Sequence, residues 1–199
     1  MCGRYGLSTP LDKLLKRYNI SKNREFSFSP KKEIFPSQKA PIIKANKNNE
    51  FDIHNFKWGF SPSFASNLII NARGETVNKK PTFKNSFYKR RCLIPVTNFY
   101  EWKTVGNKKI KYEISLKNND IFSLAGIYDN FKDDDGNKVT AFCIITISAN
   151  QKMSDLHSRM PVIIPKNIEK KWFNTNNNKQ IENMVKQFPD NYLKISKIN

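Results

Sequence analysis

The sequence contains no long hydrophobic run. No stretch approaches the ~18 consecutive apolar residues that a membrane-spanning helix needs. No apolar segment follows the start of the chain, as it would in a secretory signal peptide. We therefore expect an intracellular protein that neither crosses a membrane nor has a membrane partner.

Cysteine is scarce, with single residues at positions 2, 92 and 143 and no CxxC pair. This spacing does not favour zinc or redox motifs, and no other metal-ligand spacing is present. Cys92 and Cys143 lie in the apolar runs RCLIPV and AFCIITI, where we expect small core residues. Cys2, directly after the initiator methionine, has no such explanation.

Acidic residues are also few: 17 Asp and Glu stand against 35 Lys and Arg, a net charge of +18. An excess of this size attracts polyanions. Part of it reflects a Lys- and Asn-rich composition, but that bias does not account for the shortage of acids. The dispersed charge favours nucleic-acid contact over a basic surface. Charge alone leaves open a noncatalytic nucleic-acid-binding module.

The pattern of elements predicts one domain, residues 1–199, of the β-rich α+β class. Many short strand-like runs occupy the middle of the chain, and Gly106-Asn107 joins two of them in a predicted hairpin. Helices are expected at 8–20, where Thr9 can cap, and at 166–174 and 179–188. Strands and helices do not alternate, so we expect curled, barrel-like, mainly antiparallel sheets with a few peripheral helices.

Cys2 acquires a specific reactivity if Met1 is removed, as is usual before a small residue. The exposed α-amine and the thiol have ordinary pKa values near ~7.7–8.0 and ~8.5, so both are partly nucleophilic at neutral pH. The amine condenses with an aldehyde to an imine, and the thiol then closes a five-membered thiazolidine ring. The alternative is that the terminal cysteine is incidental.

Three further stretches carry candidate chemistry. In LIINARGET, Asn71 holds either a substrate or a turn, Arg73 suits bidentate phosphate binding, and Glu75 suits pairing with a nearby cation. In NFYEWK, aromatic neighbours desolvate Glu101 and raise its pKa, unless it faces solvent and pairs with lysine. In SDLHSRMP, His157 is either a proton shuttle or a structural histidine.

These stretches belong to an ordered set that covers most of the chain. The set comprises MCGRY, KWGFSPSF, NARGETVNKKPTF, RCLIPVTNFYEWK, FSLAGIYDNF, IITISAN and LHSRMPVII. From residue 2 to about 165 the chain closely resembles the SRAP family, the SOS response-associated peptidase-like proteins. Proteins of this family bind abasic sites in single-stranded DNA and cross-link to them through the N-terminal cysteine.

The resemblance implies a role for each matching residue. Cys2 is the implied nucleophile, Asn71 positions the sugar and the amine, Glu101 is the acid/base, and His157 transfers protons. The residues it implies at the DNA are Arg4, Arg73 and Arg159 on phosphates, Pro36 in a turn, and Phe64 near the lesion.

In this interpretation Phe64 and Phe60 stack on bases, although a position in the hydrophobic core would account for the two aromatic residues equally well. The sequence departs from the family at EIFPSQ, which replaces the usual Tyr-Asn-x-Ala-Pro turn, and at Ser158, where Asp is common. Neither departure removes a proposed catalytic residue.

The expected partner is single-stranded DNA containing abasic sites, bound by a monomer without cofactor or metal. The protein would then be cytoplasmic and nucleoid-associated in a bacterium, and nuclear in a eukaryote. The family resemblance also implies possible DNA lyase and autopeptidase activities. A thiol autopeptidase or protease-like hydrolase using Cys2 remains the alternative.

Overall fold

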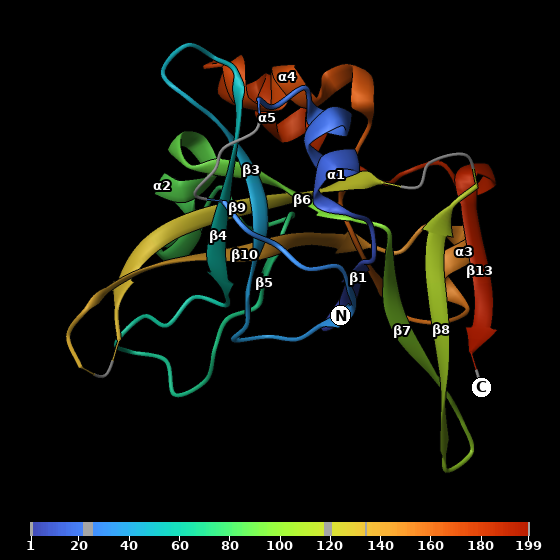
Figure 1. Ribbon diagram of the computed structural model, residues 1–199. Coiled ribbons are helices and arrows are strands. Elements are labelled where there is room, and N and C mark those ends of the chain that lie inside the picture. The colour runs from blue at the N-terminus through green and yellow to red at the C-terminus, as the bar shows by residue number, and fades with distance from the viewer. Residues whose placement is uncertain (1, 22–25, 118–120, 134, 199) are drawn as a thin grey trace.

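The protein is built on two β-sheets (Figure 1). The computed structural model describes residues 2–21, 26–117, 121–133 and 135–198, so the predicted removal of Met1 concerns a residue outside this range. The first sheet has the strand order β13–β8–β7–β1–β2 and is antiparallel throughout. Its strands are β1 (Tyr5–Leu7), β2 (Lys31–Ile34), β7 (Asn98–Val105), β8 (Lys108–Leu116) and β13 (Leu193–Ile198).

The second sheet has eight strands and curls into a ring. Its order is β11–β10–β4–β3–β6–β9–β12. The ring closes because β9 also pairs with β10, so that β10, β4, β3, β6 and β9 each have a neighbour in the ring on both sides. Only β4 and β5 run parallel to β10. Its strands are β3 (Lys39–Ala45), β4 (Phe51–Trp58), β5 (Asn71–Arg73), β6 (Arg91–Val96), β9 (Phe122–Lys132), β10 (Lys138–Ser148), β11 (Arg159–Pro161) and β12 (Ile163–Ile164).

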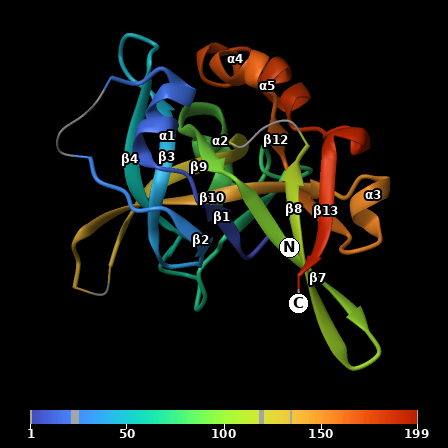
Figure 2. The same cartoon turned by 45° about the vertical axis from the view of Figure 1, so that its right-hand side comes forward.

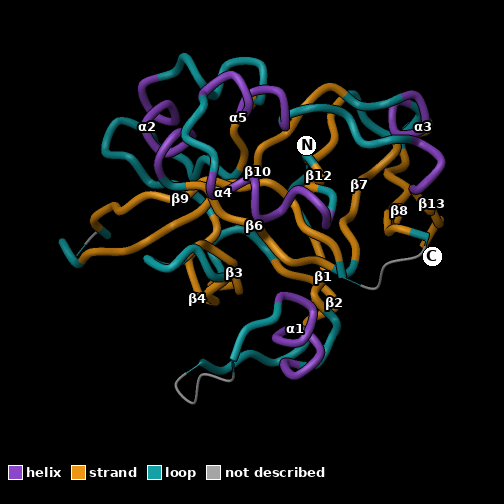
Figure 3. Tube along the Cα trace, turned by 90° about the horizontal axis from the view of Figure 1, so that it is seen from above, coloured by secondary structure: helices purple, strands orange, loops and turns teal. Residues whose placement is uncertain are grey.

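Short helices lie around the sheets (Figure 2), which confirms the predicted fold class. α2 packs against β6 and β9, and α4 packs against β3 and β6. The helices are α1 (Leu11–Tyr18), α2 (Pro81–Lys89), α3 (Gln151–Ser154), α4 (Glu169–Asn174) and α5 (Asn178–Met184), with 3-10 turns at Lys166–Ile168 and Asp190–Tyr192. Figure 3 shows α1 and α2 on opposite sides of the sheets, and Arg17 of α1 forms a 2.7 Å ion pair with Glu169 at the start of α4.

Two helices differ from the sequence prediction. The residue that caps α1 is Pro10, without a side-chain hydrogen bond, so the predicted cap at Thr9 is wrong. α2 was not predicted from the sequence. Its buried Phe83 and Phe87 are four residues apart and share one helix face, and Pro81 occupies the favourable first turn.

A buried arginine connects α2 to α4. Arg91 is 7% exposed, and its guanidinium donates hydrogen bonds at the carboxyl ends of both helices. The acceptors are the main-chain carbonyls of Phe87, Tyr88, Trp172, Phe173 and Thr175. Burial lowers the pKa of Arg91 to about 10, so the side chain remains charged at neutral pH.

The N-terminal strand lies inside the molecule. β1 pairs with β7 on one side and with β2 on the other, and the N-terminal end lies between the two sheets (Figure 1). Gly6 permits this close approach, since a Cβ there would come within 2.5 Å of both the Lys32 carbonyl oxygen and the Asn98 side chain. All three cysteines are buried, which confirms the core positions predicted for Cys92 and Cys143. None of the described helices is long and apolar enough to span a membrane.

Candidate active site around Cys2

Cys2 has no solvent-exposed surface. Its Sγ lies 3.9 Å from the main-chain oxygen of Arg4, within the range of a weak thiol hydrogen bond. Burial raises the pKa of the thiol above its usual range, and the negative charge of Glu101 raises it further. The thiol is therefore protonated at neutral pH as long as this environment is intact.

Asn71 holds the main chain of Cys2. It begins β5, and its backbone is positioned by parallel pairing with Ile144 in β10. The side-chain amide of Asn71 donates a 3.1 Å hydrogen bond to the carbonyl oxygen of Cys2. Its Oδ1 is buried and accepts no hydrogen bond from the described residues, so this oxygen has capacity for a further donor.

Glu101 lies on the inner side of β7 and is 2% exposed. Strand alternation directs Tyr100 and Trp102 to the opposite face. Burial raises the pKa of the carboxyl to about 7, in the predicted direction, although Tyr100 and Trp102, the neighbours expected to desolvate it, face the other side. A carboxyl with this pKa exchanges a proton readily near neutral pH. Because Glu101 raises the pKa of the Cys2 thiol, the two groups are electrostatically coupled.

His157 lies in a tight turn, two residues before the start of β11. Its main-chain N–H donates to the Met153 carbonyl at 3.0 Å, and the Arg159 N–H donates to its Nδ1 at 2.9 Å. This second bond favours the neutral tautomer with the proton on Nε2. Burial also lowers the pKa of His157, so the imidazole is neutral at pH 7.

A bidentate ion pair joins the His157 turn to the strand of Asn71. Arg159 contacts the two carboxylate oxygens of Glu75 at 2.6 and 2.8 Å, and it also donates to the Thr146 carbonyl at 2.7 Å. The Arg159 hydrogen bonds lower the pKa of Glu75 to about 2. The predicted pairing of Glu75 with a cation is thus confirmed. Arg159, predicted as a phosphate contact, has its guanidinium occupied by Glu75 in this structure.

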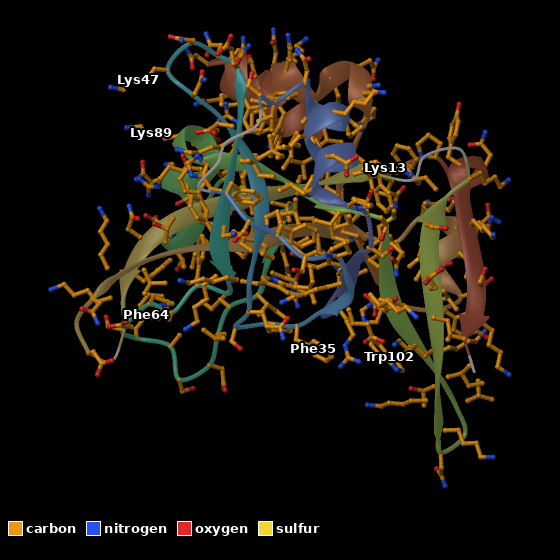
Figure 4. The ribbon with its side chains drawn as sticks, viewed as in Figure 1. Lys13, Phe35, Lys47, Phe64, Lys89 and Trp102 are labelled. Atoms are coloured by element: carbon orange, nitrogen blue, oxygen red, sulfur yellow. The ribbon has the colours of Figure 1, made fainter. Side chains whose placement is uncertain are left out.

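Arg4 belongs to a cluster on the first sheet. Its guanidinium lies 4.2 Å from the centre of the Phe35 ring and 5.1 Å from that of Trp102, and Nη1 forms a 2.9 Å ion pair with Glu33. Lys111 bonds the other oxygen of Glu33. Phe35 and Trp102 lie near each other in the lower half of the view in Figure 4, above the tip of the β7–β8 hairpin.

Lys111 was not predicted as a site residue, although the sequence contains a signal for it. The predicted hairpin at Gly106-Asn107 pairs Trp102 with Lys111, and this register is observed. Glu33 and Phe35 reach the cluster from β2 and the residue after it, which no local pattern indicates.

The remaining predicted DNA contacts are dispersed. Arg73 is exposed at the end of β5, and Pro36 is half-buried. Phe64 is 73% exposed in the loop after β4 and lies far from Phe35 and Trp102 in Figure 4. Phe60 is buried, so its burial alternative is correct. No three His, Cys, Asp or Glu residues within the described ranges are grouped so that they could hold a metal ion.

The fold and the site together define a class of protein: a β-rich fold that buries an N-terminal cysteine beside the amide of Asn71 and the carboxyl of Glu101. The family model for the SOS response associated peptidase (SRAP) matches residues 1–199. The chain therefore belongs to the SRAP family, as its ordered motifs predicted.

Relatives are similar over most of their length. The chain is 37% identical over 185 residues to abasic site processing protein YoqW of Bacillus subtilis (strain 168), covering 89% of this chain and 82% of YoqW. It is 36% identical to YobE of the same organism, covering 89% and 84%. A crystal structure of a Bacteroides thetaiotaomicron protein superposes with a TM-score of 0.89 and 28% identity, covering 100% of this chain and 92% of that one.

Proposed function

We propose that this protein processes abasic sites in single-stranded DNA by forming a covalent cross-link through Cys2, once Met1 has been removed. The surroundings of Cys2 carry the proposal: the residue is buried, its carbonyl is held by Asn71, and its thiol is coupled to Glu101. The names of the relatives, abasic site processing proteins, and the net charge of +18 support the substrate class.

The proposed chemistry balances without a cofactor. The ring-opened sugar of an abasic site presents an aldehyde at C1′. The α-amine of Cys2 condenses with this aldehyde, which forms an imine and releases one water. The thiol then adds across the C=N bond, so that sulfur bonds to carbon and the thiol proton passes to nitrogen. The product is a thiazolidine that joins the protein to the DNA.

Glu101 suits the proton transfers of both steps. A carboxyl with a pKa of about 7 donates a proton to the departing hydroxyl during imine formation and accepts one from the thiol during ring closure. The raised pKa of Cys2 makes such a base necessary, because little thiolate is present at neutral pH. The protonated Nε2 inferred for His157 is suited to donate to the sugar oxygen.

DNA binding is proposed to rest on the residues that the sequence indicated. Arg4 and Arg73 contact backbone phosphates, Pro36 lines the path of the strand, and Phe64 stacks on a base at the exposed loop. Arg159 takes part either by contacting a phosphate or by positioning His157. Affinity for single-stranded DNA then falls with salt, with a slope near −0.7 for each phosphate contacted.

The test is the intact mass of the purified protein before and after incubation with an abasic single-stranded oligonucleotide. We expect loss of Met1, then a heat-stable species with the mass of protein plus oligonucleotide minus one water. Cys2→Ser and a tag placed before Cys2 should abolish it, whereas Cys143→Ala, which removes another buried thiol, should not. An equal adduct from Cys2→Ser would overturn the proposal.

Peptide hydrolysis through Cys2 is the second candidate. The buried cysteine and the neutral His157 are compatible with a thiol autopeptidase or protease-like hydrolase. The raised thiol pKa speaks against it, since thiol proteases depend on a lowered pKa. Repeated cleavage of a peptide in trans would favour this candidate, and unchanged DNA binding by Cys2→Ala without any adduct would favour a noncatalytic binding module.

A further inference from the structure

Glu33 is shared by two cations on one face of the first sheet. One carboxylate oxygen accepts from Arg4 Nη1 at 2.9 Å, and the other accepts from Lys111 Nζ. The three side chains are 22–30% exposed, so the cluster is within reach of solvent. These hydrogen bonds, that of Lys111 foremost, lower the pKa of Glu33, so it is ionised at neutral pH.

Aromatic rings surround both cations. The guanidinium of Arg4 lies over Phe35 and beside Trp102, while the ammonium of Lys111 lies 4.3 Å from the Tyr100 ring centre and 5.8 Å from that of Trp102. Rings beside cations are the usual composition of surfaces that bind single-stranded nucleic acid, where bases stack and cations hold the backbone. Glu33 is the carboxylate that both cations contact, and it repels a phosphate.

The hydrogen bonding of Arg4 is also incomplete. Its Nε is buried and makes no hydrogen bond to the described residues, while Nη1 is engaged by Glu33. Guanidinium groups bind phosphate through two parallel N–H donors. Because Arg4 makes a single hydrogen bond to Glu33, its Nε–H remains a donor that a second acceptor oxygen would satisfy.

We propose that Glu33 occupies the position of a backbone phosphate between Arg4 and Lys111, and that single-stranded DNA displaces this carboxylate when it binds. The inference rests on the proposed function insofar as the ligand is single-stranded DNA, and it adds Lys111 to the phosphate contacts. Glu33 thereby lowers affinity for any single strand. Only ligands that gain further contacts, such as the capture of an abasic sugar at Cys2, overcome this competition.

The test compares Glu33→Gln with Glu50→Gln, which removes the same charge from an exposed position in the β3–β4 turn. Binding of an undamaged single-stranded oligonucleotide is measured by fluorescence anisotropy across a salt series. Glu33→Gln should bind about threefold to tenfold more tightly than wild type at low salt. Its salt slope should steepen by roughly 0.7–1.4, equivalent to one or two additional phosphates. Glu50→Gln should change affinity by less than about twofold.

Lys111→Gln provides an independent measurement. It should weaken binding more in the Glu33→Gln background than in wild type, since Glu33 already neutralises Lys111 in wild type. Glu33→Gln binding no more tightly than Glu50→Gln, or Lys111→Gln having equal effects in both backgrounds, would overturn the inference. Undamaged DNA keeps this result separate from the cross-linking proposal, which is tested by adduct formation with the abasic oligonucleotide and its dependence on Cys2.

Discussion

The side-chain amide of Asn71 donates a 3.1 Å hydrogen bond to the carbonyl oxygen of Cys2, although 69 positions separate the two residues. This bond connects the second sheet, through β5, to the segment that leads into the first sheet. It fixes the residue that carries both proposed nucleophiles, the amine and the thiol.

Asn71→Ala should slow cross-linking by about tenfold to a hundredfold, because the amine and thiol lose their defined position relative to the aldehyde. The cost in folding stability should be only about 1 kcal/mol. Single-turnover adduct formation and thermal unfolding measure the two effects. Asn67→Ala, an exposed asparagine in the preceding loop, is the matched control. A normal rate for Asn71→Ala would show that the bond has no role in the reaction.

Glu101 should make stability depend on pH. Its pKa is raised from 4.5 to about 7 in the folded protein, so the folded state binds more protons than the unfolded state between these values. The wild type therefore loses stability as pH rises from about 4.5 to 7, by up to about 3 kcal/mol. Glu101→Gln removes this loss. In urea unfolding, the variant should gain stability relative to wild type between pH 5 and pH 8, and a constant difference would contradict the assignment.

A substitution at Arg159 can distinguish its two candidate roles, contact with a phosphate and positioning of His157. Because its guanidinium is bound to Glu75 and Thr146, we expect Arg159→Lys to disturb the His157 turn rather than a phosphate contact. Cross-linking should slow by about tenfold, with affinity for undamaged single-stranded DNA changed by less than about twofold. Loss of affinity with a salt slope shallower by about 0.7 would instead assign Arg159 to a phosphate.

Arg91 should be among the most sensitive positions for stability. Arg91→Met leaves the carbonyls at the ends of α2 and α4 without their donors, which should cost about 3–5 kcal/mol. Arg90→Met is the neighbouring control and should cost about 1 kcal/mol, since the Arg90–Asp129 ion pair is partly exposed. Chemical denaturation of both variants measures the difference, and equal costs would contradict the role given to Arg91.

Local sequence signals predicted much of the fold, but they did not predict how the second sheet closes into a ring. Gly106 and Asn107 predicted the β7–β8 hairpin with its register, since a two-residue turn determines the pairing of its strands. The parallel pairing of β10 with β4 and β5 joins segments remote in sequence, and such pairing leaves no local pattern. The ring of the second sheet was therefore predicted only as a curled, barrel-like sheet.

The candidate site also contains features that the sequence predicted and features that depend on pairing between distant segments. Residue chemistry indicated Glu101 and its raised pKa, and it indicated that Glu75 pairs with a cation. The identity of that cation, Arg159, depends on the antiparallel pairing of β11 with β10. Glu33 was missed because its importance comes from its contacts with Arg4, just before β1, and Lys111, in β8. No spacing in the sequence relates these three positions.

The enclosed position of Cys2 has a consequence for biosynthesis. β1 can pair with β7 only after β7 has been synthesised, and β7 begins at residue 98. At translation rates of about 5–20 residues per second, the N-terminus is without this partner for roughly 5–20 s. An aminopeptidase that removes Met1 from the nascent chain has this interval in which to act. Under the proposed function, a chain that folds before Met1 is removed already buries Cys2, so the order of trimming and folding would determine the fraction able to cross-link.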